Sequence, residues 1–344
     1  MKVDKRVQGI LDSAQSGVAP SREACVWLLQ FHETSLEASL LRAVADACSR
    51  RRFDNGGIVL GQIGVEIAAC PGKCKFCSFG EGHTTFEPSA MSDEDILSSA
   101  DNFTASGELF ALFLMTMHTF DFERLIRIVR KVRARIPQAT QIVVNIGDFD
   151  HAQARDLKAA GVNGAYHVCR LREGVDTALD PEQRKATIRV IKNVGLDWYY
   201  CCEPIGPEHS PEKLADQIFL GLEYGCFQHA AMRRVYVPSA PLAHNGQISE
   251  LRLAQVTAVV TLATLACTET RSIAVHEPNL LGLTAGANTV YAEAGANPRD
   301  LEKNTLGHRG RDLRACKTML YEAGFVQLQA SPTRSIALGE AYRG

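Results

Sequence analysis

Apolar runs recur along this chain, and most are followed by a segment with the hydrophobic period of a helix. The runs are near-continuous and rich in β-branched residues, as in strands that are buried on both faces of a parallel sheet. The pattern predicts strands at residues 58–69, 109–117, 141–146, 164–169, 197–202, 228–237, 271–276 and 287–291. The last two are the weakest. We therefore expect parallel strands connected by helices.

Capping residues define where the connecting helices begin and end. Ser92 and Asp121 can cap helices, and proline follows a capping residue at Asp180-Pro181 and Ser210-Pro211. Glycines stand where helical patterns stop, at positions 161, 195, 225 and 324. No G-x-G-x-x-G motif follows the first strand, so a dinucleotide-binding sheet lacks support. We predict an α/β fold, a complete or nearly complete parallel (β/α) barrel, with its chemistry at the carboxyl ends of the strands.

The pattern also suggests how the chain is divided. Residues 1–56 indicate a helical extension, with helices over 22–31 and 36–51 that we expect to pack on or close the barrel bottom. Residues 57–325 would form the barrel. Residues 326–344 would form a C-terminal tail.

Composition excludes several classes of protein. The 344 residues are 46% hydrophobic and 22% charged, with a net charge of −2, which gives no reason to expect nucleic acid or an anionic membrane as partner. The N-terminus lacks the apolar segment of a signal peptide, and the longest nearly apolar run, 254–267, is too short for a membrane span. The eleven cysteines are an odd number, which argues against a disulfide scaffold. We expect a cytoplasmic protein.

Three cysteines stand close together after the first predicted strand. Cys70, Cys74 and Cys77 have the spacing C-x3-C-x2-C, and the aromatic Phe76 precedes the third. Three thiolates on one loop can bind three irons of a cubane cluster, which leaves the fourth iron open for a substrate or cofactor. A zinc site, or a cluster completed by a fourth cysteine elsewhere, is the structural alternative.

This motif, on the first loop of a predicted parallel barrel, resembles the radical S-adenosylmethionine (SAM) superfamily. Several weaker segments resemble its biotin synthase-like branch, which includes hydrogenase-maturation and methylornithine synthase enzymes; these segments are 161–170, 181–184, 203–206, 237–242 and 285–288. The last two resemble a C-terminal module associated with biotin and thiamin synthesis, at about 237–325. The resemblance implies a [4Fe-4S] cluster and SAM, whose reductive cleavage gives a 5′-deoxyadenosyl radical that abstracts hydrogen from a substrate.

The resemblance also implies which residues bind SAM. These are Phe76, His118, Asn145, Arg170, Arg172, Glu173, Arg184 and Gly206. Arg184 would pair with the SAM carboxylate, and Gly206 would let the backbone approach the adenine. Whether Arg172 or Glu173 points inward is open. Residues 117–121 depart from the Gly-Gly-Glu-like segment of the family, which puts amine binding by this loop in doubt.

Other cysteines raise the question of a second cluster. Biotin synthase holds one with cysteines on its second, third and fifth strands, but here only the fifth strand carries any, Cys201 and Cys202. Authentic biotin synthase activity is therefore not expected. Cys169, Cys201 and Cys202, with His118, His167 or His276, remain candidates for an auxiliary iron–sulfur cluster. The same cysteines and His276 are the catalytic candidates, as a substrate thiol site or a radical-quenching group, and buried packing is the alternative.

These features leave three functions open. The first is a radical SAM enzyme of cofactor or specialised-metabolite biosynthesis that performs carbon-skeleton, C–C or C–N chemistry. The second is sulfur insertion with an auxiliary cluster. The third is a non-catalytic iron–sulfur or zinc protein. The enzyme readings imply a small-molecule substrate and a reductant such as flavodoxin or ferredoxin. The adjacent Arg233 and Arg234 place one arginine in the lumen, which would suit a small polar substrate.

Overall fold

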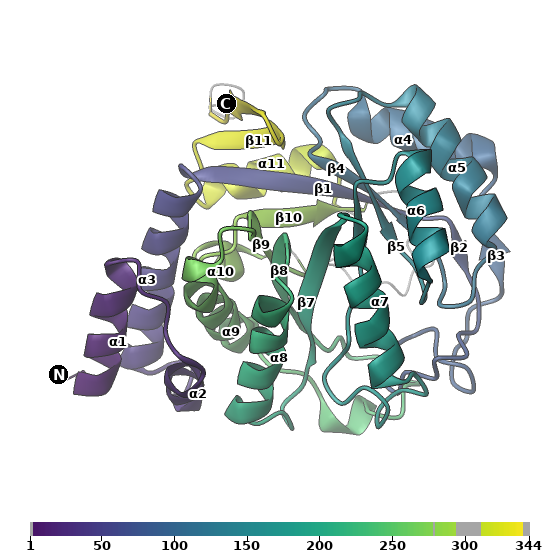
Figure 1. Cartoon of the computed structure of the whole chain (residues 1–344). Coiled ribbons are helices and arrows are strands. Elements are labelled where there is room, and N and C mark those ends of the chain that lie inside the picture. Colours follow the sequence, from purple (N-terminus) through teal and green to yellow (C-terminus); the bar gives the residue numbers. More distant parts are fainter. Residues whose placement is uncertain (1–2, 278, 294–310, 340–344) are drawn as a thin grey trace.

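The computed structural model describes residues 3–277, 279–293 and 311–339, and its centre is a closed parallel barrel of eight strands (Figure 1). The barrel strands, in order around the sheet, are β1 (Gly56–Gly64), β4 (Ala111–Met115), β5 (Gln141–Asn145), β6 (Gly164–Tyr166), β7 (Asp197–Ile205), β8 (Gln228–Arg233), β9 (Ser272–Val275) and β10 (Thr289–Ala292). All eight strand regions predicted from the hydrophobic pattern are confirmed, and so is the barrel.

Strand β1 closes the barrel because it pairs on both sides. Its residues 58–61 lie in register with 289–292 of β10, and its residues 60–64 with 111–115 of β4. All pairings around the ring are parallel, so every strand of the ring ends at the same face. That face, the mouth, is where the loops after the strands gather.

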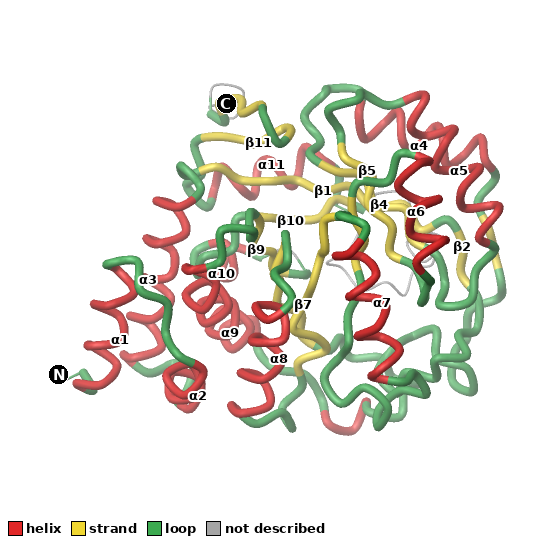
Figure 2. Tube along the Cα trace, in the orientation of Figure 1, coloured by secondary structure: helices red, strands yellow, loops and turns green. Residues whose placement is uncertain are grey.

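Helices cover the outside of the barrel and connect its strands (Figure 2). They are α4 (Asp93–Thr104), α5 (Phe122–Arg135), α6 (His151–Ala160), α7 (Pro181–Asn193), α8 (Pro211–Glu223), α9 (Glu250–Ala263), the short α10 (Leu280–Leu283) and α11 (Leu313–Glu322). The predicted caps Ser92, Asp121, Asp180 and Ser210 each accept a hydrogen bond from a backbone N–H of the first turn. The glycines at 161, 195, 225 and 324 all have positive φ, as left-handed residues at helix ends do.

Aromatic rings fill the lower part of the barrel lumen. Phe113 of β4 makes edge-to-face contacts with Tyr199 of β7 and Tyr291 of β10, at centroid distances of 5.3 and 5.4 Å. Tyr199 and Phe227 lie 5.1 Å apart. The rings of Phe113, Tyr199 and Tyr291 are buried, so in the described residues this part of the lumen is a packed core and a site belongs at its upper end.

The N-terminal helices pack on the flank of the barrel. They are α1 (Lys5–Gln15), α2 (Arg22–Gln30) and α3 (Leu36–Arg52). Helix α2 lies against α8, and α3 lies against α9 (Figure 1). Gln255 of α9 joins the layers, because its side-chain amide donates to the carbonyls of Leu28 and Phe31. The last turn of α3 reaches the loop that precedes β9, at the barrel bottom.

Two regions differ from the sequence prediction. The strand expected over 58–69 ends at Gly64, and Glu66–Ile67 (β2) forms a separate ribbon with Ser89–Ala90 (β3). Within the range predicted as a tail, β11 (Gln327–Ser331) pairs with the start of β1, and β12 (Arg334–Ala337) pairs with β11. The barrel sheet thus extends beyond the closed ring.

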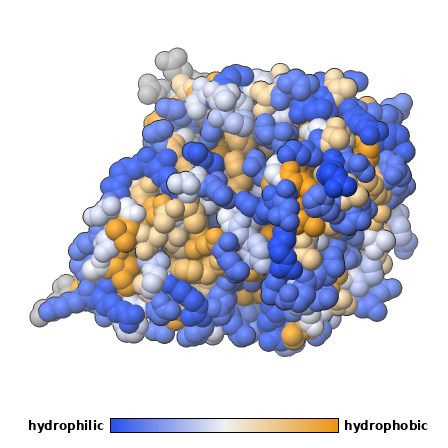
Figure 3. Space-filling model, viewed as in Figure 1, coloured by the Kyte–Doolittle hydropathy of each residue, from blue (hydrophilic) through white to orange (hydrophobic). Residues whose placement is uncertain are grey.

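Polar side chains cover most of the face in Figure 3, with apolar patches between the helices. In the part of the chain that the structure describes, no helix has the length and apolar character needed to cross a bilayer.

Candidate active site

The three cysteines lie on a compact loop between β2 and β3, beyond the carboxyl end of β1. The amide of Lys73 donates to the carbonyl of Cys70, and the amide of Cys77 donates to that of Cys74, both at 3.1 Å. The amide of Cys70 donates to Phe79 at 2.7 Å, which closes the base of the loop. Successive turns therefore hold the three thiols on one short stretch of backbone.

The three thiols are close enough to influence one another. Cys74 is buried, whereas Cys70 and Cys77 are partly exposed. Burial, with the neighbouring Cys70 and Cys77 thiolates, raises the pKa of Cys74 to about 12, although Arg170 opposes this shift. In the described residues no group of three or more His, Cys, Asp or Glu converges on a single metal ion. A cubane cluster does not need such convergence, because each thiolate binds a different iron. The three-thiol loop fits a cluster of this kind.

Two other mouth loops hold the cysteine loop in place. The amide of Lys75 donates to Asp176, and its ammonium group donates to the carbonyl of Val175 at 2.7 Å. From the other side, the amide of Leu242 donates to the carbonyl of Lys75. The cysteine loop therefore lies between the loop that follows β6 and the one that follows β8.

A buried ion network lies beside the cysteine loop. The Nε of Arg170 lies 3.0 Å from a carboxylate oxygen of Glu203, and its Nη1 lies 3.9 Å from Glu173. Burial alone would lower the pKa of Arg170, but Glu203 and Glu173 raise it above its usual value. The Tyr166 hydroxyl donates to the second oxygen of Glu203 at 2.6 Å. One arginine thus faces two carboxylates at the top of the lumen.

The loop after β6 shows which of Arg172 and Glu173 points inward. The Glu173 side chain is 1% exposed and accepts hydrogen bonds from the Arg170 amide and the Thr177 hydroxyl. Arg172 has positive φ and turns to Asp176, with its Nε 2.7 Å from that carboxylate. Glu173 is the inward side chain and Arg172 is the outward one.

A second polar cluster surrounds Asp148, which follows β5. Its Oδ1 accepts hydrogen bonds from Nη1 of Arg184 at 3.0 Å and from the Thr187 hydroxyl at 3.1 Å, and Nε2 of His167 lies 3.1 Å away. Burial would raise the pKa of Asp148, but His167 and Arg184 outweigh it and lower the pKa. Burial also lowers the pKa of His167 to about 3, so this imidazole is neutral.

Arg184, the predicted partner of the SAM carboxylate, belongs to this cluster. Its side chain is 4% exposed, and its Nε donates to the carbonyl of Val168 at 3.0 Å. It therefore contacts the backbone and Asp148 rather than open solvent. The role predicted for it stays a prediction.

His118 stands at the mouth opposite Asp148, with its Nε2 4.0 Å from Oδ2 of that carboxylate. Burial, together with the positive charge of Arg184, lowers the pKa of His118. The carbonyl of His118 lies directly over Gly147, where a Cβ would come within 1.8 Å of it. Only glycine at 147 lets the loops after β4 and β5 approach this closely.

The other predicted SAM contacts are at the mouth but are not all open. Phe76 lies on the cysteine loop and Asn145 ends β5, both half-buried. Gly206 directly follows β7, and a Cβ there would lie 2.6 Å from Nη1 of Arg234. Arg234 pairs with Glu208 above this glycine. Arg233 likewise pairs with Glu277, at 2.6 Å.

The candidate cysteines outside the loop face different surroundings. The Tyr200 hydroxyl donates a hydrogen bond to the Gln217 carbonyl on α8, so this side chain faces the helices. Because side chains alternate along a strand, Cys202 faces the helices too, and Cys201 faces the lumen. Cys201 lies beside Tyr166 and Glu203. Cys169 lies 3.9 Å from the carbonyl of Pro181 on α7. The structure does not bring these three thiols together.

His276 is close to the lumenal aromatic rings. Its ring stacks on Tyr291 at 4.6 Å and meets Tyr166 edge-on at 5.9 Å. This places it in the upper lumen, on the side of Tyr166 and Glu203.

Asp148, Tyr166 and Glu203 were not predicted as site residues. Glu203 and Tyr166 stood in segments that carry the family resemblance, and Asp148 follows a strand end after a glycine. A polar residue just past the carboxyl end of a barrel strand is the signal that could have identified Asp148.

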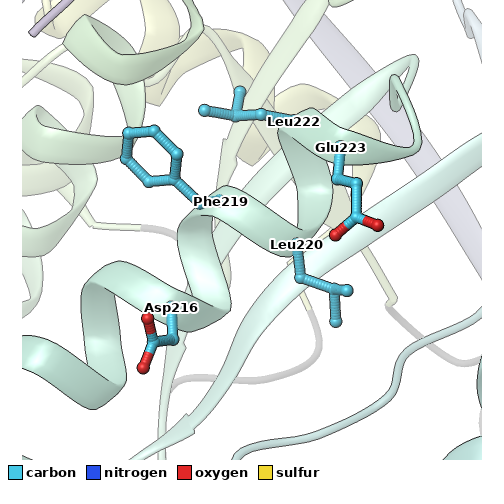
Figure 4. A pocket seen from close by; sticks show the side chains of 5 residues that line it. All are labelled: Asp216, Phe219, Leu220, Leu222 and Glu223. Carbon is cyan, nitrogen blue, oxygen red and sulfur yellow. The ribbon is translucent and has the colours of Figure 1, made fainter. Parts of the chain in front are cut away.

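A shallow depression on the outer face of α8 is unrelated to this site. Asp216, Phe219, Leu220, Leu222 and Glu223 line it (Figure 4). These residues lie on the second half of α8, toward the barrel bottom, whereas the cysteine loop lies at the mouth.

Comparison with known proteins identifies the fold. No family model and no curated protein sequence matches the chain. Among solved structures, methylornithine synthase (PylB) is 17% identical with a TM-score of 0.77 and covers 92% of this chain and 96% of its own. The hydrogenase maturase HydG is 12% identical with a TM-score of 0.78, over 96% of this chain and 77% of its own. HydG from Carboxydothermus hydrogenoformans is 15% identical with a TM-score of 0.76, over 94% and 79%.

The chain shares the closed parallel barrel fold of these radical SAM enzymes. Both PylB and HydG represent the biotin synthase-like branch that the sequence resembles, so the predicted fold class is confirmed. In this barrel the cysteine loop occupies the mouth beside β1, and the Arg170 and Asp148 clusters lie at the same end.

Proposed function

We propose that the protein is a radical SAM enzyme that cleaves SAM reductively and abstracts hydrogen from a small-molecule substrate. The observation that carries this proposal is the loop with Cys70, Cys74 and Cys77 at the mouth of this particular barrel. Three thiols on a closed loop suit a [4Fe-4S] cluster with one iron left for SAM. When bound, the cluster would supply the electron for cleavage of the sulfonium.

The chain's own residues would bind SAM and exclude water. Glu173 and Glu203 give the upper lumen two carboxylates against the single guanidinium of Arg170, which favours a sulfonium cation. The aromatic floor formed by Phe113, Tyr199 and Tyr291 keeps the lumen below the site dry. A dry, charged chamber suits the formation of a reactive radical.

Within this class we propose carbon-skeleton, C–C or C–N chemistry with a single cluster. Sulfur insertion would need a second, sacrificial cluster. Cys201 and Cys202 face opposite sides of β7, and Cys169 lies against α7, so these thiols form no lumenal set for that cluster among the residues that the structure describes. We further propose a cytoplasmic enzyme of cofactor or specialised-metabolite biosynthesis that takes electrons from a reductant such as flavodoxin or ferredoxin.

Anaerobic reconstitution with iron and sulfide tests the proposal. The wild-type protein, given dithionite and SAM, is expected to form 5′-deoxyadenosine and methionine and to contain about four irons per chain, the content of one cubane. Cys77→Ala should lose both the cluster absorbance and the cleavage. Cys267→Ala, a half-buried cysteine outside the loop, is the matched control and should keep both.

Each alternative has its own signature in the same experiment. A protein that keeps its cluster absorbance but forms no 5′-deoxyadenosine would be a non-catalytic iron–sulfur protein, and the proposal would be wrong. Six to eight irons per chain would favour sulfur insertion over the single-cluster chemistry.

A further inference from the structure

The gap between Asp148 and His118 has the geometry of a binding site for an amino group. Oδ2 of Asp148 and Nε2 of His118 face each other across 4.0 Å, which is too far for a direct hydrogen bond. One nitrogen placed between them can lie about 2.8–2.9 Å from both atoms, the usual length of a hydrogen bond. The gap can therefore hold a single donor group between two acceptors.

The Asp148 carboxylate is positioned to accept a hydrogen bond from such a donor. Its Oδ1 already accepts hydrogen bonds from Arg184 and Thr187, and this oxygen lies beside His167. Among the described residues, none donates a hydrogen bond to Oδ2, and the side chain is 19% exposed. The carboxylate is thus held rigidly on one side and is open on the other.

His118 completes the gap with a neutral ring. Its side chain is 25% exposed, and its position is fixed because its carbonyl packs on Gly147. Burial lowers its pKa, so the ring has an unprotonated nitrogen at neutral pH. In the tautomer with the proton on Nδ1, Nε2 is the acceptor that faces the gap.

The gap and the cysteine loop lie at the same mouth of the barrel. The charges of Arg170 and Glu173 act on the pKa values of both His118 and Cys74. A ligand anchored near these thiols can reach the gap with a short polar arm.

We propose that Asp148 and His118 bind the amino group of SAM. This inference rests on the proposed function. It assigns amine binding to Asp148, which lies outside residues 117–121, together with the side chain of His118 within that segment. Arg184 is then a positioning residue. It holds Asp148 through Oδ1, and it does not itself pair with the SAM carboxylate.

Equilibrium binding tests the assignment without turnover. The cluster-loaded protein, kept oxidised so that SAM is not cleaved, is titrated by calorimetry with SAM and with a SAM analogue that has hydrogen in place of the α-amino group. Asp148→Asn should weaken SAM binding about 10- to 100-fold, the range for a hydrogen bond to a charged group. It should leave the affinity for the analogue unchanged. His118→Leu should show the same selectivity with a smaller loss.

Two further variants sharpen the test. Asp150→Asn makes the same charge change two residues away, at the exposed cap of α6, where asparagine also caps, and it should bind both ligands as the wild type does. If Arg184 acts through Asp148, Arg184→Gln should weaken the binding of SAM and leave the affinity for the analogue unchanged. Equal weakening of both ligands would instead mean that Arg184 binds the carboxylate.

The inference and the proposed function fail in different ways. If the wild type binds and cleaves SAM while Asp148→Asn binds SAM as tightly, the amino-group site is wrong and the proposed function stands. Equal losses for SAM and the analogue in Asp148→Asn, with unchanged iron content, would also overturn the site. If the wild-type holoprotein neither binds nor cleaves SAM, the proposed function itself is wrong.

Discussion

Gly147 shapes the mouth by having no side chain. A Cβ at this position would come within 1.8 Å of the carbonyl of His118, so alanine cannot be accommodated unless one of the two loops moves. Gly147→Ala should lower the free energy of unfolding by about 1–3 kcal/mol, the usual cost of overpacking. It should also weaken SAM binding, because it displaces His118 from Asp148. Thermal unfolding and calorimetry measure the two effects.

Gly9 is the matched control for this substitution. It lies inside helix α1, and no atom lies within 4 Å of the position of its added Cβ. Gly9→Ala should therefore raise the free energy of unfolding by about 0.5–1 kcal/mol, the helix preference for alanine over glycine. If Gly147→Ala lowered the free energy of unfolding no more than Gly9→Ala does, the close approach of the two loops would be contradicted.

The residues of the site divide into those that sequence can reveal and those that it cannot. The spacing of Cys70, Cys74 and Cys77 is local, so the sequence alone predicts the cluster loop. Asp148 gains its role from Arg184, which is 36 positions away and comes close only when α7 packs against the loop after β5. Such pairing depends on the fold, so no local pattern predicts it.

At the level of elements, the barrel strands were predictable because burial on both faces makes them almost entirely apolar. Strand β11 was missed for the opposite reason. Its sequence alternates polar and apolar residues, and it lies outside the closed ring, where it pairs only with the first two residues of β1 and with β12. The barrel strands were predicted from continuous apolar runs, which are absent here, and an alternation of only five residues is too short to stand out.

His229 connects strand β8 to helix α8. Its Nε2 lies 3.0 Å from the Ile218 carbonyl, beneath Gly221, where a Cβ would come within 2.6 Å of the ring. Complete burial lowers the pKa of His229 to about 4. The folded protein therefore leaves this ring neutral in a range where the unfolded chain, with a pKa of about 6.5, takes up a proton.

This difference predicts a loss of stability in acid. Because the unfolded state binds more protons, stability falls as the pH drops from about 6.5 to 4, and His229 accounts for about 2 kcal/mol of the loss by pH 5. His229→Gln should be less stable than the wild type at pH 7 but should lose about 2 kcal/mol less between pH 7 and pH 5. Urea unfolding at the two pH values measures this, and parallel losses in both proteins would contradict it.

At the scale of the whole molecule, the last turn of α3 connects parts that are distant in sequence. Three consecutive arginines there each donate to one or more backbone carbonyls at or just beyond the end of a different helix. Arg50 binds the end of α11, Arg51 binds the end of α1, and Arg52 binds the segment that follows α9. Cations favour helix C-termini, where carbonyls lack partners within the helix. This turn joins the flanking helices to the barrel.

The number of carbonyls that each arginine binds predicts how much each one stabilises the molecule. Arg52 is half-buried and donates to the carbonyls of Thr264, Cys267 and Thr270, whereas the exposed Arg51 donates to one carbonyl, that of Gln15. Arg52→Ala should lower the free energy of unfolding by about 2–3 kcal/mol, because it leaves several carbonyls unpaired. Arg51→Ala should cost less than about 1 kcal/mol, as surface substitutions usually do. Thermal unfolding of both variants gives the order, and equal effects would contradict the idea that the number of bound carbonyls sets each arginine's contribution.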